Sequence, residues 1–300
     1  MCKEIKFIQL NGAPTKVITW GKSLGEKFYS DDHKELILVI PGNPGVTQLY
    51  EPFLDNLYAQ LQKPIWIVGH SGHEKPEDFD TTQKETPFNF TLEAQINHKK
   101  TFIETYIPKD IKIHLVGHSV GAFSSLKLLE DESIKNRIKK TYFMFPTIEH
   151  LGKSKNGLFM TRIIKPIVPI ILFLAWIFTL LPALIQIFCI HIYLFVTGIE
   201  KHHLDAIVKF VDPFILRNIF QMAYDQIRDA TKRPDDKLMK HKDILQCYYA
   251  EIDNWVPRKS PKNLMATLPQ LDVEISKDGE HCFVLYQSKE MADIVVNWFR

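Results

Sequence analysis

The sequence has no excess of charge of either sign, since 37 Lys and Arg stand against 35 Asp and Glu. A near-neutral chain lacks the positive surface of a general nucleic-acid binder, so we expect no nucleic-acid partner. Its 13 glycines and 17 prolines follow no repeat, which excludes collagen-like and low-complexity proteins. Hydrophobic residues make up 45% of the chain, and that share excludes global disorder.

Cysteine is scarce as well, and no two cysteines form a CxxC pair. The four stand at Cys2, Cys189, Cys247 and Cys282. No Cys and His cluster has the spacing of a structural zinc site, so the sequence implies no metal and no cofactor. A long chain with few cysteines is typical of a reducing compartment. The N-terminus lacks the apolar run of a secretory signal peptide, and Cys2 is a possible, though uncommon, acylation site.

Most of the chain alternates short apolar segments with segments of helical periodicity. We expect strands at 4–10, 15–20, 35–40, 65–68, 111–116, 141–145, 244–250 and 271–275. We expect helices at 49–61, 92–107, 121–129, 261–268 and 289–299. This alternation predicts a three-layer α/β fold with a mainly parallel sheet. The near-continuous apolar run at 35–40 predicts a strand buried on both faces.

One segment, residues 150–240, interrupts the alternation. The sequence therefore predicts one α/β domain of residues 1–149 and 241–300, with residues 150–240 as a cap insert. Within the insert, the 34 residues from Pro166 to Ile199 include no Asp, Glu, Lys or Arg. The mixed-charge stretch from Asp225 to Asp243 is expected to return, solvated, to the globular body.

The uncharged stretch is too long for one membrane crossing and its halves are short for two. As a single helix it would extend about 51 Å, against roughly 30 Å of bilayer hydrocarbon. Pro182 divides it into helices expected at 170–181 and 183–197. Since the flanking strands join one sheet, the insert must begin and end on one side of a membrane. A hydrophobic hairpin at about 163–199, or two helices lying in the interface, satisfies this condition.

The residues around this stretch favour an anionic lipid surface over the alternative of a buried cap core. The basic flanking residues are Lys153, Lys155, Arg162 and Lys165 before the run, and Lys201, His202 and His203 after it. Basic residues beside a shallow apolar element bind anionic lipids. We expect the anchor to include Phe173, Trp176, Pro182 and Phe188.

A candidate nucleophile lies in Gly117-His118-Ser119-Val120-Gly121, which matches G-x-S-x-G. The motif follows an expected strand and opens an expected helix, and this context exposes the serine on a tight turn. A second serine, in Gly69-His70-Ser71-Gly72-His73, is followed by polar loop residues. We expect Ser71 to be a loop residue, while His70 and His73 remain possible neighbours of the site.

Acyl transfer also needs donors for the tetrahedral oxyanion, a base and an acid. The backbone amide of Val120 is one expected donor, and the loop after the third strand supplies the other. In that loop Asn43 is favoured over Gly42, and Pro44 has no amide hydrogen. His281, the one histidine after position 241, is the expected base.

In this architecture the acid precedes the histidine and follows a late strand. Asp253 is favoured over Glu251, because it lies further along the exit from its strand, and it is also favoured over Asp212 and Asp278. A serine nucleophile argues against the epoxide hydrolases and dehalogenases that attack with a carboxylate. The expected reaction is ester hydrolysis through an acyl-enzyme.

Together these segments resemble the lipid droplet-associated hydrolase family of α/β-hydrolases. The resemblance rests on residues 40–45, 69–73, 117–121 and 253–257 and on Glu280-His281, and it covers essentially the whole chain. The Pro-Gly-Asn-Pro-Gly segment at 41–45 is its most specific part, and Ser71 departs from the alanine that the family usually carries there.

The resemblance implies an α/β-hydrolase fold and a serine hydrolase on the cytosolic face of lipid droplets and endoplasmic reticulum. It implies neutral lipid esters as substrates, cholesteryl ester before triglyceride, and a role in cholesterol and triglyceride homeostasis. A weakly active or non-catalytic lipid-droplet protein, which promotes lipid storage or tethering, is the alternative.

Overall fold

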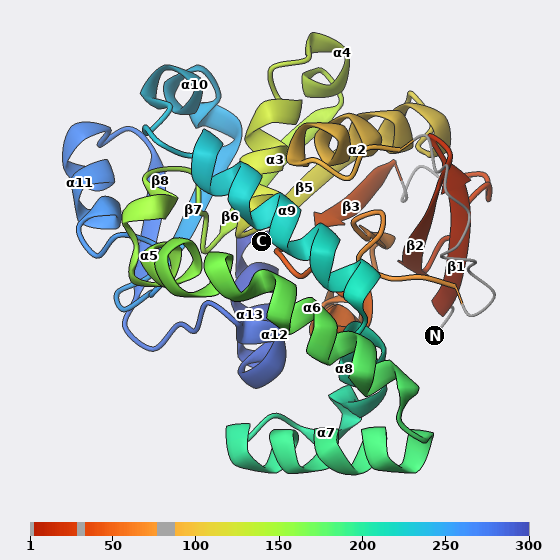
Figure 1. Ribbon diagram of the computed structural model, residues 1–300. Helices are drawn as coiled ribbons and strands as arrows, with labels where there is room; N and C mark the ends of the chain where they lie inside the picture. The colour runs from red at the N-terminus through yellow and green to blue at the C-terminus, as the bar shows by residue number, and fades with distance from the viewer. Residues whose placement is uncertain (1–2, 29–33, 77–87, 300) are drawn as a thin grey trace.

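The computed structural model describes residues 3–28, 34–76 and 88–299, so the possible acylation site Cys2 lies outside the described residues. Its described part contains one sheet of eight strands (Figure 1). The strands are β1 (Lys3–Leu10), β2 (Ala13–Trp20), β3 (Glu35–Ile40), β4 (Ile65–Val68), β5 (Lys112–His118), β6 (Ile138–Met144), β7 (Leu245–Ala250) and β8 (Asp272–Ser276). Every expected strand is confirmed, with ends that differ by three residues at most.

The sheet is parallel except at one edge. Its order is β1-β2-β4-β3-β5-β6-β7-β8, and β2 runs antiparallel to both of its neighbours. All pairs from β4 to β8 are parallel, so their carboxyl ends lie at the same edge of the sheet. Strand β3 lies inside the sheet and alternates its apolar side chains between the two faces, as its continuous apolar run predicts.

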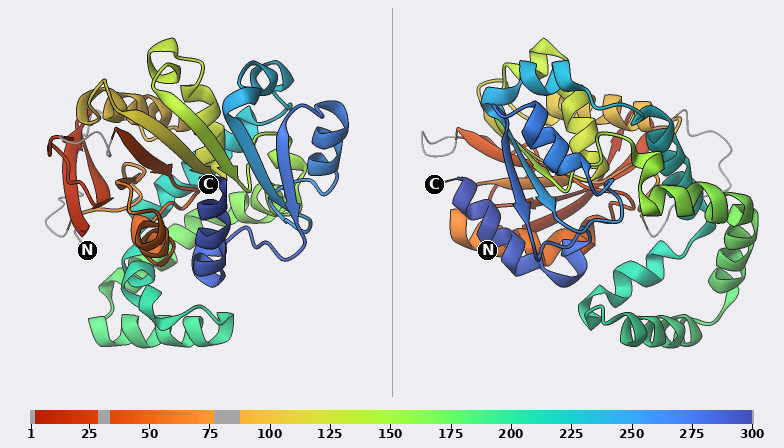
Figure 2. Two further views of the ribbon diagram at one scale, coloured as in Figure 1. Left: turned by 180° about the vertical axis from the view of Figure 1, so that it is seen from behind. Right: turned by 90° about the vertical axis from the view of Figure 1, so that its left-hand side faces the viewer.

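Helices cover both faces of the sheet, which gives three layers (Figures 1 and 2). Helices α1 (Glu51–Leu61) and α13 (Ser288–Trp298) bury their apolar sides on one face. Helices α2 (Leu92–Tyr106), α3 (Val120–Leu128) and α11 (Ser260–Thr267) cover the other. Two short helices, α4 (Glu132–Lys135) and α12 (Phe283–Tyr286), complete this body. All five helices expected in this body are thus confirmed.

The segment between β6 and β7 forms a helical array of its own. Its helices are α5 (Lys155–Phe159), α6 (Lys165–Leu180), α7 (Ala183–Thr197), α8 (Leu204–Phe210), α9 (Pro213–Asp229) and α10 (Asp235–Lys240). The first apolar helix starts earlier than residue 170, where the sequence predicts it. A π-helical turn at Met160–Ile164 joins α5 to α6 and lets the helix continue past Pro166, so one helix covers Lys155–Leu180.

Helices α6 and α7 diverge from their connection at Pro182 and do not lie side by side as a hairpin (Figures 1 and 2). One side of α6 packs on α9 through Ala175, and α7 packs on α8 through Ile190 and Leu194. Their outer sides are apolar and open. Of the expected anchors, Phe173, Trp176 and Phe188 are 56%, 49% and 64% exposed, and Pro182 is exposed too.

Two charged residues near the apolar stretch differ from expectation. Most charged residues of Asp225–Asp243 are exposed or half-exposed, as a solvated stretch predicts, but Asp225 itself is only 3% exposed, because α9 lies against α2 and turns this carboxylate inward. His203 is buried as well, since the short turn at Lys201–His203 packs into the body, so it adds no surface charge. The other basic flanking residues are exposed.

Candidate active site

Ser119 stands on a sharp turn between β5 and α3. Its backbone has φ +54° and ψ −116°, a conformation that costs energy for a residue with a side chain. The helix after it can approach β3 only because residue 121 is glycine, since a Cβ there would lie 2.1 Å from the carbonyl oxygen of Ile40. This geometry explains why the motif requires glycine near the serine, and it presents Ser119 at the carboxyl edge of the sheet.

Ser119, His281 and Asp253 form one continuous chain of hydrogen bonds. His281 Nε2 lies 3.0 Å from Ser119 Oγ, and His281 Nδ1 lies 2.7 Å from Asp253 Oδ2. A carboxylate can only accept, so Nδ1 carries the proton and Nε2 is free to accept the serine proton. The Asp253 side chain is 2% exposed, and its other oxygen accepts the amide hydrogen of Trp255 over 2.7 Å.

The other carboxylates considered as the acid have different neighbours. Glu251 is exposed and pairs with Lys262 over 3.3 Å. Asp212 pairs with Lys75 over 2.5 Å and caps the start of α9. Asp278 lies in an exposed turn. The structure therefore brings Asp253, and none of these three, to His281.

The loop after β3 passes beside the serine. A Cβ at Gly42 would lie 3.3 Å from the Cβ of Ser119. The Gly42 amide donates to the hydroxyl of Tyr50 over 2.8 Å, so it already has an acceptor. Asn43 stays the predicted donor of the pair, and its side chain donates to the carbonyl oxygen of Ile219 in α9 over 3.0 Å.

His70 and His73 lie beneath this loop and hold it by its carbonyl groups. His70 Nε2 lies 3.1 Å from the carbonyl oxygens of both Pro41 and Gly42, and His73 Nδ1 lies 2.6 Å from that of Pro44. Burial lowers the pKa of His73 to about 4 and holds that of His70 well below its usual range, so both are neutral donors. They shape the loop and do not reach Ser119.

Ser71 is fully buried and bonds to Thr15 and His98, over 2.8 Å and 3.3 Å. It follows the short strand β4 in a tight turn, as expected of a loop residue. A serine without solvent exposure has no access to a substrate, which leaves Ser119 as the candidate nucleophile.

A second hydrogen-bond chain joins the loop after β3 to the backbone of His281, and the sequence gives no sign of it. His118 Nε2 lies 2.9 Å from the His281 carbonyl oxygen, so this nitrogen donates. Burial, and then the nearby His281, lowers the pKa of His118 to about 3, so its Nδ1 is an acceptor. Tyr50 donates to that Nδ1 over 2.6 Å while accepting from Gly42.

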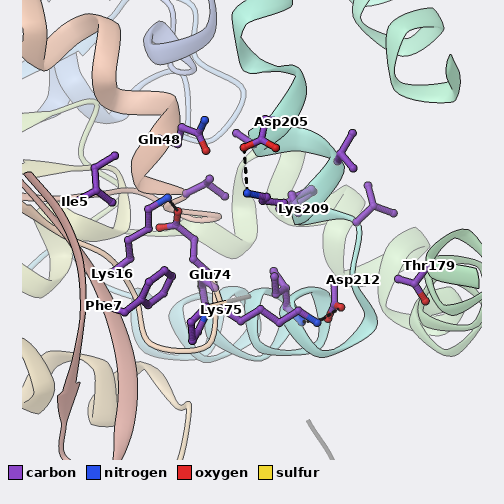
Figure 3. A pocket seen from close by; sticks show the side chains of 18 of the residues that line it. Ile5, Phe7, Lys16, Gln48, Glu74, Lys75, Thr179, Asp205, Lys209 and Asp212 are labelled. Atoms are coloured by element: carbon purple, nitrogen blue, oxygen red, sulfur yellow. Dashed lines mark hydrogen bonds and ion pairs between the residues drawn. The ribbon is translucent and has the colours of Figure 1, made fainter. Parts of the chain in front are cut away.

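The site is nearly closed to solvent. Ser119 is 9% exposed, and α9 is bonded through Ile219 to Asn43 in the loop that passes beside the serine. A cavity of about 580 Å³ lies elsewhere, between the β1 edge and helices α8 and α9, and none of the triad residues lines it (Figure 3). Its wall includes the ion pairs Lys16–Glu74 and Lys75–Asp212 beside apolar side chains such as Phe7 and Phe210. Among the described residues, no group of three His, Cys, Asp or Glu could hold a metal ion.

Solved structures with the same architecture define the class of the fold. A bromoperoxidase from Bacillus anthracis superposes with a TM-score of 0.62 at 15% identity, covering 99% of both chains. A membrane phospholipase A, a bacterial virulence factor, gives 0.64 at 13% identity, covering 99% of this chain and 86% of the other. Identities this low show the fold alone, and that fold is the α/β-hydrolase fold.

The chain belongs to the lipid-droplet associated hydrolase family, whose model matches residues 33–284. The lipid droplet-associated hydrolase of Drosophila melanogaster is 34% identical over 298 residues, covering 96% of this chain and 95% of the fly protein. The lipid droplet-associated hydrolase of Homo sapiens is 30% identical over 311 residues, covering 97% and 93%. The resemblance noted from the sequence is thus confirmed.

Proposed function

We propose that this protein is a serine hydrolase of carboxylic esters, with Ser119 as nucleophile, His281 as base and Asp253 as the acid that orients His281. The observation that carries the proposal is the hydrogen-bond chain from Ser119 Oγ through His281 to Asp253, 3.0 Å and 2.7 Å long. The strained turn at Ser119 supports it independently, because such strain persists where function requires an exposed nucleophile.

The reaction then runs in two balanced halves. Ser119 Oγ attacks the ester carbonyl carbon while its proton passes to His281 Nε2, and the amides of Val120 and Asn43 bind the oxyanion. Collapse breaks the bond to the alcohol, which leaves with the proton from His281. Water then attacks the carbonyl carbon of the acyl-enzyme in the same way. A proton of the water passes to His281 and then to Ser119 Oγ as the carboxylic acid leaves.

We infer that the esters are those of neutral lipids, with cholesteryl esters first and glycerides second, and that the enzyme acts in cholesterol and triglyceride homeostasis. The names of the fly and human relatives support the lipid droplet as the place where the enzyme acts. The inserted segment supports it physically, because large apolar side chains such as Phe195, 89% exposed, form its open side.

The proposed association is monotopic, on the cytosolic face of the endoplasmic reticulum and on lipid droplets. By length and composition, Lys155–Leu180 could cross a membrane, and 6% of its most apolar stretch is buried. Strands β6 and β7 are parallel neighbours, so the chain must return to the side it left. Helix α7 has 15 residues, about 22 Å, which is shorter than the roughly 30 Å core. Two helices lying in the membrane interface fit these observations better than helices that cross the membrane.

This assignment divides the chain into a catalytic domain, 1–149 and 241–300, and a membrane-associating cap, 150–240. Helix α9 is part of the cap and contacts both parts. It packs on α6 through Ile215 and Ile219, and its Gln226 bonds to Thr147, which lies beside Ser119.

The experiment that tests the proposal is hydrolysis of lipid esters at a droplet surface. The full chain is incubated with emulsion droplets that contain cholesteryl oleate or triolein, and the released fatty acid is measured. We expect release by the native protein and none above background by the Ser119→Ala variant. Equal fatty-acid release by both proteins would overturn the proposal. A folded, droplet-bound native protein that releases none would favour the storage or tethering function, which the nearly closed site also favours.

A further inference from the structure

Thr147, which follows β6, touches the candidate nucleophile. Its Oγ1 lies 3.4 Å from Ser119 Oγ, and Thr147 itself is 2% exposed. A second residue, Gln226 of α9, bonds to Thr147 twice. The Gln226 amide lies 2.9 Å from the Thr147 carbonyl oxygen and 2.7 Å from Thr147 Oγ1. Neither residue is visible in any motif of the sequence.

The hydroxyl and amide hydrogens of Ser119, Thr147 and Gln226 can be assigned from the partners of each group. A backbone carbonyl only accepts, so the Gln226 atom that faces it is the NH2 nitrogen, and the same nitrogen donates to Thr147 Oγ1. The Thr147 hydroxyl hydrogen is therefore free for Ser119. The serine hydrogen goes to His281 Nε2, because the other histidine nitrogen donates to Asp253. Thr147 is thus the donor in its contact with Ser119.

We propose that Thr147 is a further catalytic residue, whose O–H stabilises the negative charge that develops on Ser119 Oγ, and that Gln226 of α9 is the positioning residue that aims it. This inference rests on the proposed function. The charge appears on Ser119 Oγ as its proton leaves for His281, and again when the acyl-enzyme breaks down. A hydrogen-bond donor directed at that oxygen lowers the barrier to acylation of Ser119 and the barrier to breakdown of the acyl-enzyme.

The length of the contact sets the size of the effect. A distance of 3.4 Å is long for an O–H···O bond, but bonds to a reacting group often shorten in the transition state. A hydrogen bond of ordinary strength changes a rate roughly tenfold, and we expect a loss of that order.

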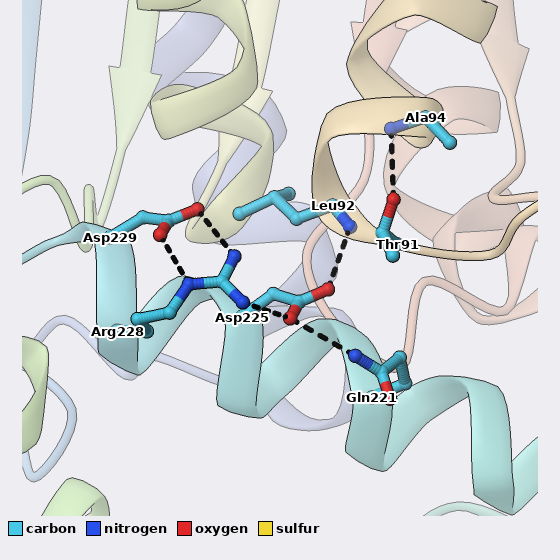
Figure 4. A network of polar contacts seen from close by, with 7 residues as sticks. All are labelled: Thr91, Leu92, Ala94, Gln221, Asp225, Arg228 and Asp229. Carbon is cyan, nitrogen blue, oxygen red and sulfur yellow. Dashed lines mark hydrogen bonds and ion pairs between the residues drawn. The ribbon is translucent and has the colours of Figure 1, made fainter.

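Helix α9 belongs to the insert and is fixed in place beside Gln226. The orientation of the Thr147 hydroxyl therefore depends on the insert. Asp225 accepts hydrogen bonds from the backbone amide of Leu92 in α2 and from Arg228 and Gln221 in α9 (Figure 4). Asn218 also donates to the Gly72 carbonyl oxygen over 3.1 Å. The insert therefore contributes to the chemistry through Gln226 as well as covering the site.

The test measures the second-order rate of labelling by a fluorophosphonate, and kcat and KM for a short p-nitrophenyl ester, over a range of pH. We expect Thr147→Val to label roughly tenfold more slowly, with kcat reduced, KM unchanged and the pH midpoint of activity unchanged. Thr147→Ser keeps the O–H and should recover most of the rate. Gln226→Met should slow labelling, and adding it to Thr147→Val should slow labelling no further.

Thr141→Val is the matched control. Thr141 is also fully buried, on β6, and its hydroxyl has no hydrogen-bond partner among the described residues, so its loss should leave the rate unchanged. A native protein that labels, with Thr147→Val labelling equally fast, would overturn the inference and leave the proposed function standing. Slow labelling of Thr147→Ser, or additive effects of Thr147→Val and Gln226→Met, would also overturn it. Failure of the native protein to label would overturn the proposed function itself.

Discussion

At the scale of single residues, Asp253 determines which nitrogen of His281 carries a proton. Asp253→Asn preserves the size of the side chain but can donate to Nδ1, which stabilises the unproductive tautomer. We expect kcat to fall by about 10⁴-fold, measured with a soluble p-nitrophenyl ester. Glu251→Gln, two residues earlier and paired with Lys262, serves as the control and should keep the native rate. A native rate in Asp253→Asn would remove Asp253 from the triad.

The lowered pKa of Glu35 predicts how the free energy of unfolding depends on pH. Burial raises its pKa, but hydrogen bonds from Lys139 and Lys63 outweigh burial and lower it from 4.5 to about 2. The carboxylate therefore stabilises the fold fully above pH 4.5, and this contribution disappears as the pH falls toward 2. Glu35→Gln should lose roughly 1–2 kcal/mol of unfolding free energy at pH 7, after allowance for solvent screening.

Urea denaturation at several pH values measures this effect. The native protein and Glu35→Gln should differ most at neutral pH and converge near pH 2. A constant difference across the whole range would show that the ion pairs do not lower this pKa.

The sequence predicts those candidate site residues whose chemistry is local. Ser119 follows from its turn motif, and His281 and Asp253 follow from their positions after late strands; the structure places these three in one hydrogen-bond chain. Asn43, predicted from the prolines and glycines around it, stays a prediction. Thr147, Gln226, Tyr50 and His118 are not predicted as partners, because each acts through a contact between elements distant in the chain. Only the tertiary fold creates those contacts.

At the scale of elements, α9 is fixed to α2 by a buried carboxylate. Asp225 is 3% exposed and accepts the amide of Leu92 over 3.1 Å (Figure 4). Asp225→Asn puts an NH2 group where an acceptor is needed, so we expect a loss of about 1–3 kcal/mol in unfolding free energy by urea denaturation. Asp229→Asn, in the same helix but more exposed, should change it by less than about 0.5 kcal/mol. Equal losses would contradict this role of Asp225.

Helices and strands with a clear hydrophobic periodicity are predicted well from the sequence, whereas their arrangement in space is not. The strands and the helices of the body follow from apolar patterning, because burial in the sheet demands it. The start of the Lys155–Leu180 helix is missed, since a π-helical turn before Pro166 leaves no mark in the pattern. The divergence of α6 and α7, and the burial of Asp225, depend on what α8 and α9 pack against.

At the scale of the whole molecule, a water-exposed hydrolase body carries an apolar surface on its insert. Phe188 and Phe195 project from α7 and are 64% and 89% exposed. The double change Phe188→Asp and Phe195→Asp should release most of the protein from droplets, because burying charge in lipid is costly. The fraction that floats with emulsion droplets in a density gradient measures this.

The control for flotation is Met265→Asp, which places a charge on α11, away from α7 (Figure 1). Met265 is 44% exposed, so this change should leave flotation at the native level. Unchanged flotation of the α7 double variant would place the membrane-binding surface elsewhere on the molecule. Both variants should keep their activity on a soluble ester, because neither change touches the triad.

The most direct measurement of the central claim is the mass of the intact protein, and of its peptides, after reaction with a fluorophosphonate. Ser119 Oγ should form a bond to phosphorus as fluoride leaves, which gives one adduct that maps to Ser119 and is absent from Ser119→Ala. The account predicts this single adduct. An adduct on another residue, or a folded native protein that carries none, would contradict it.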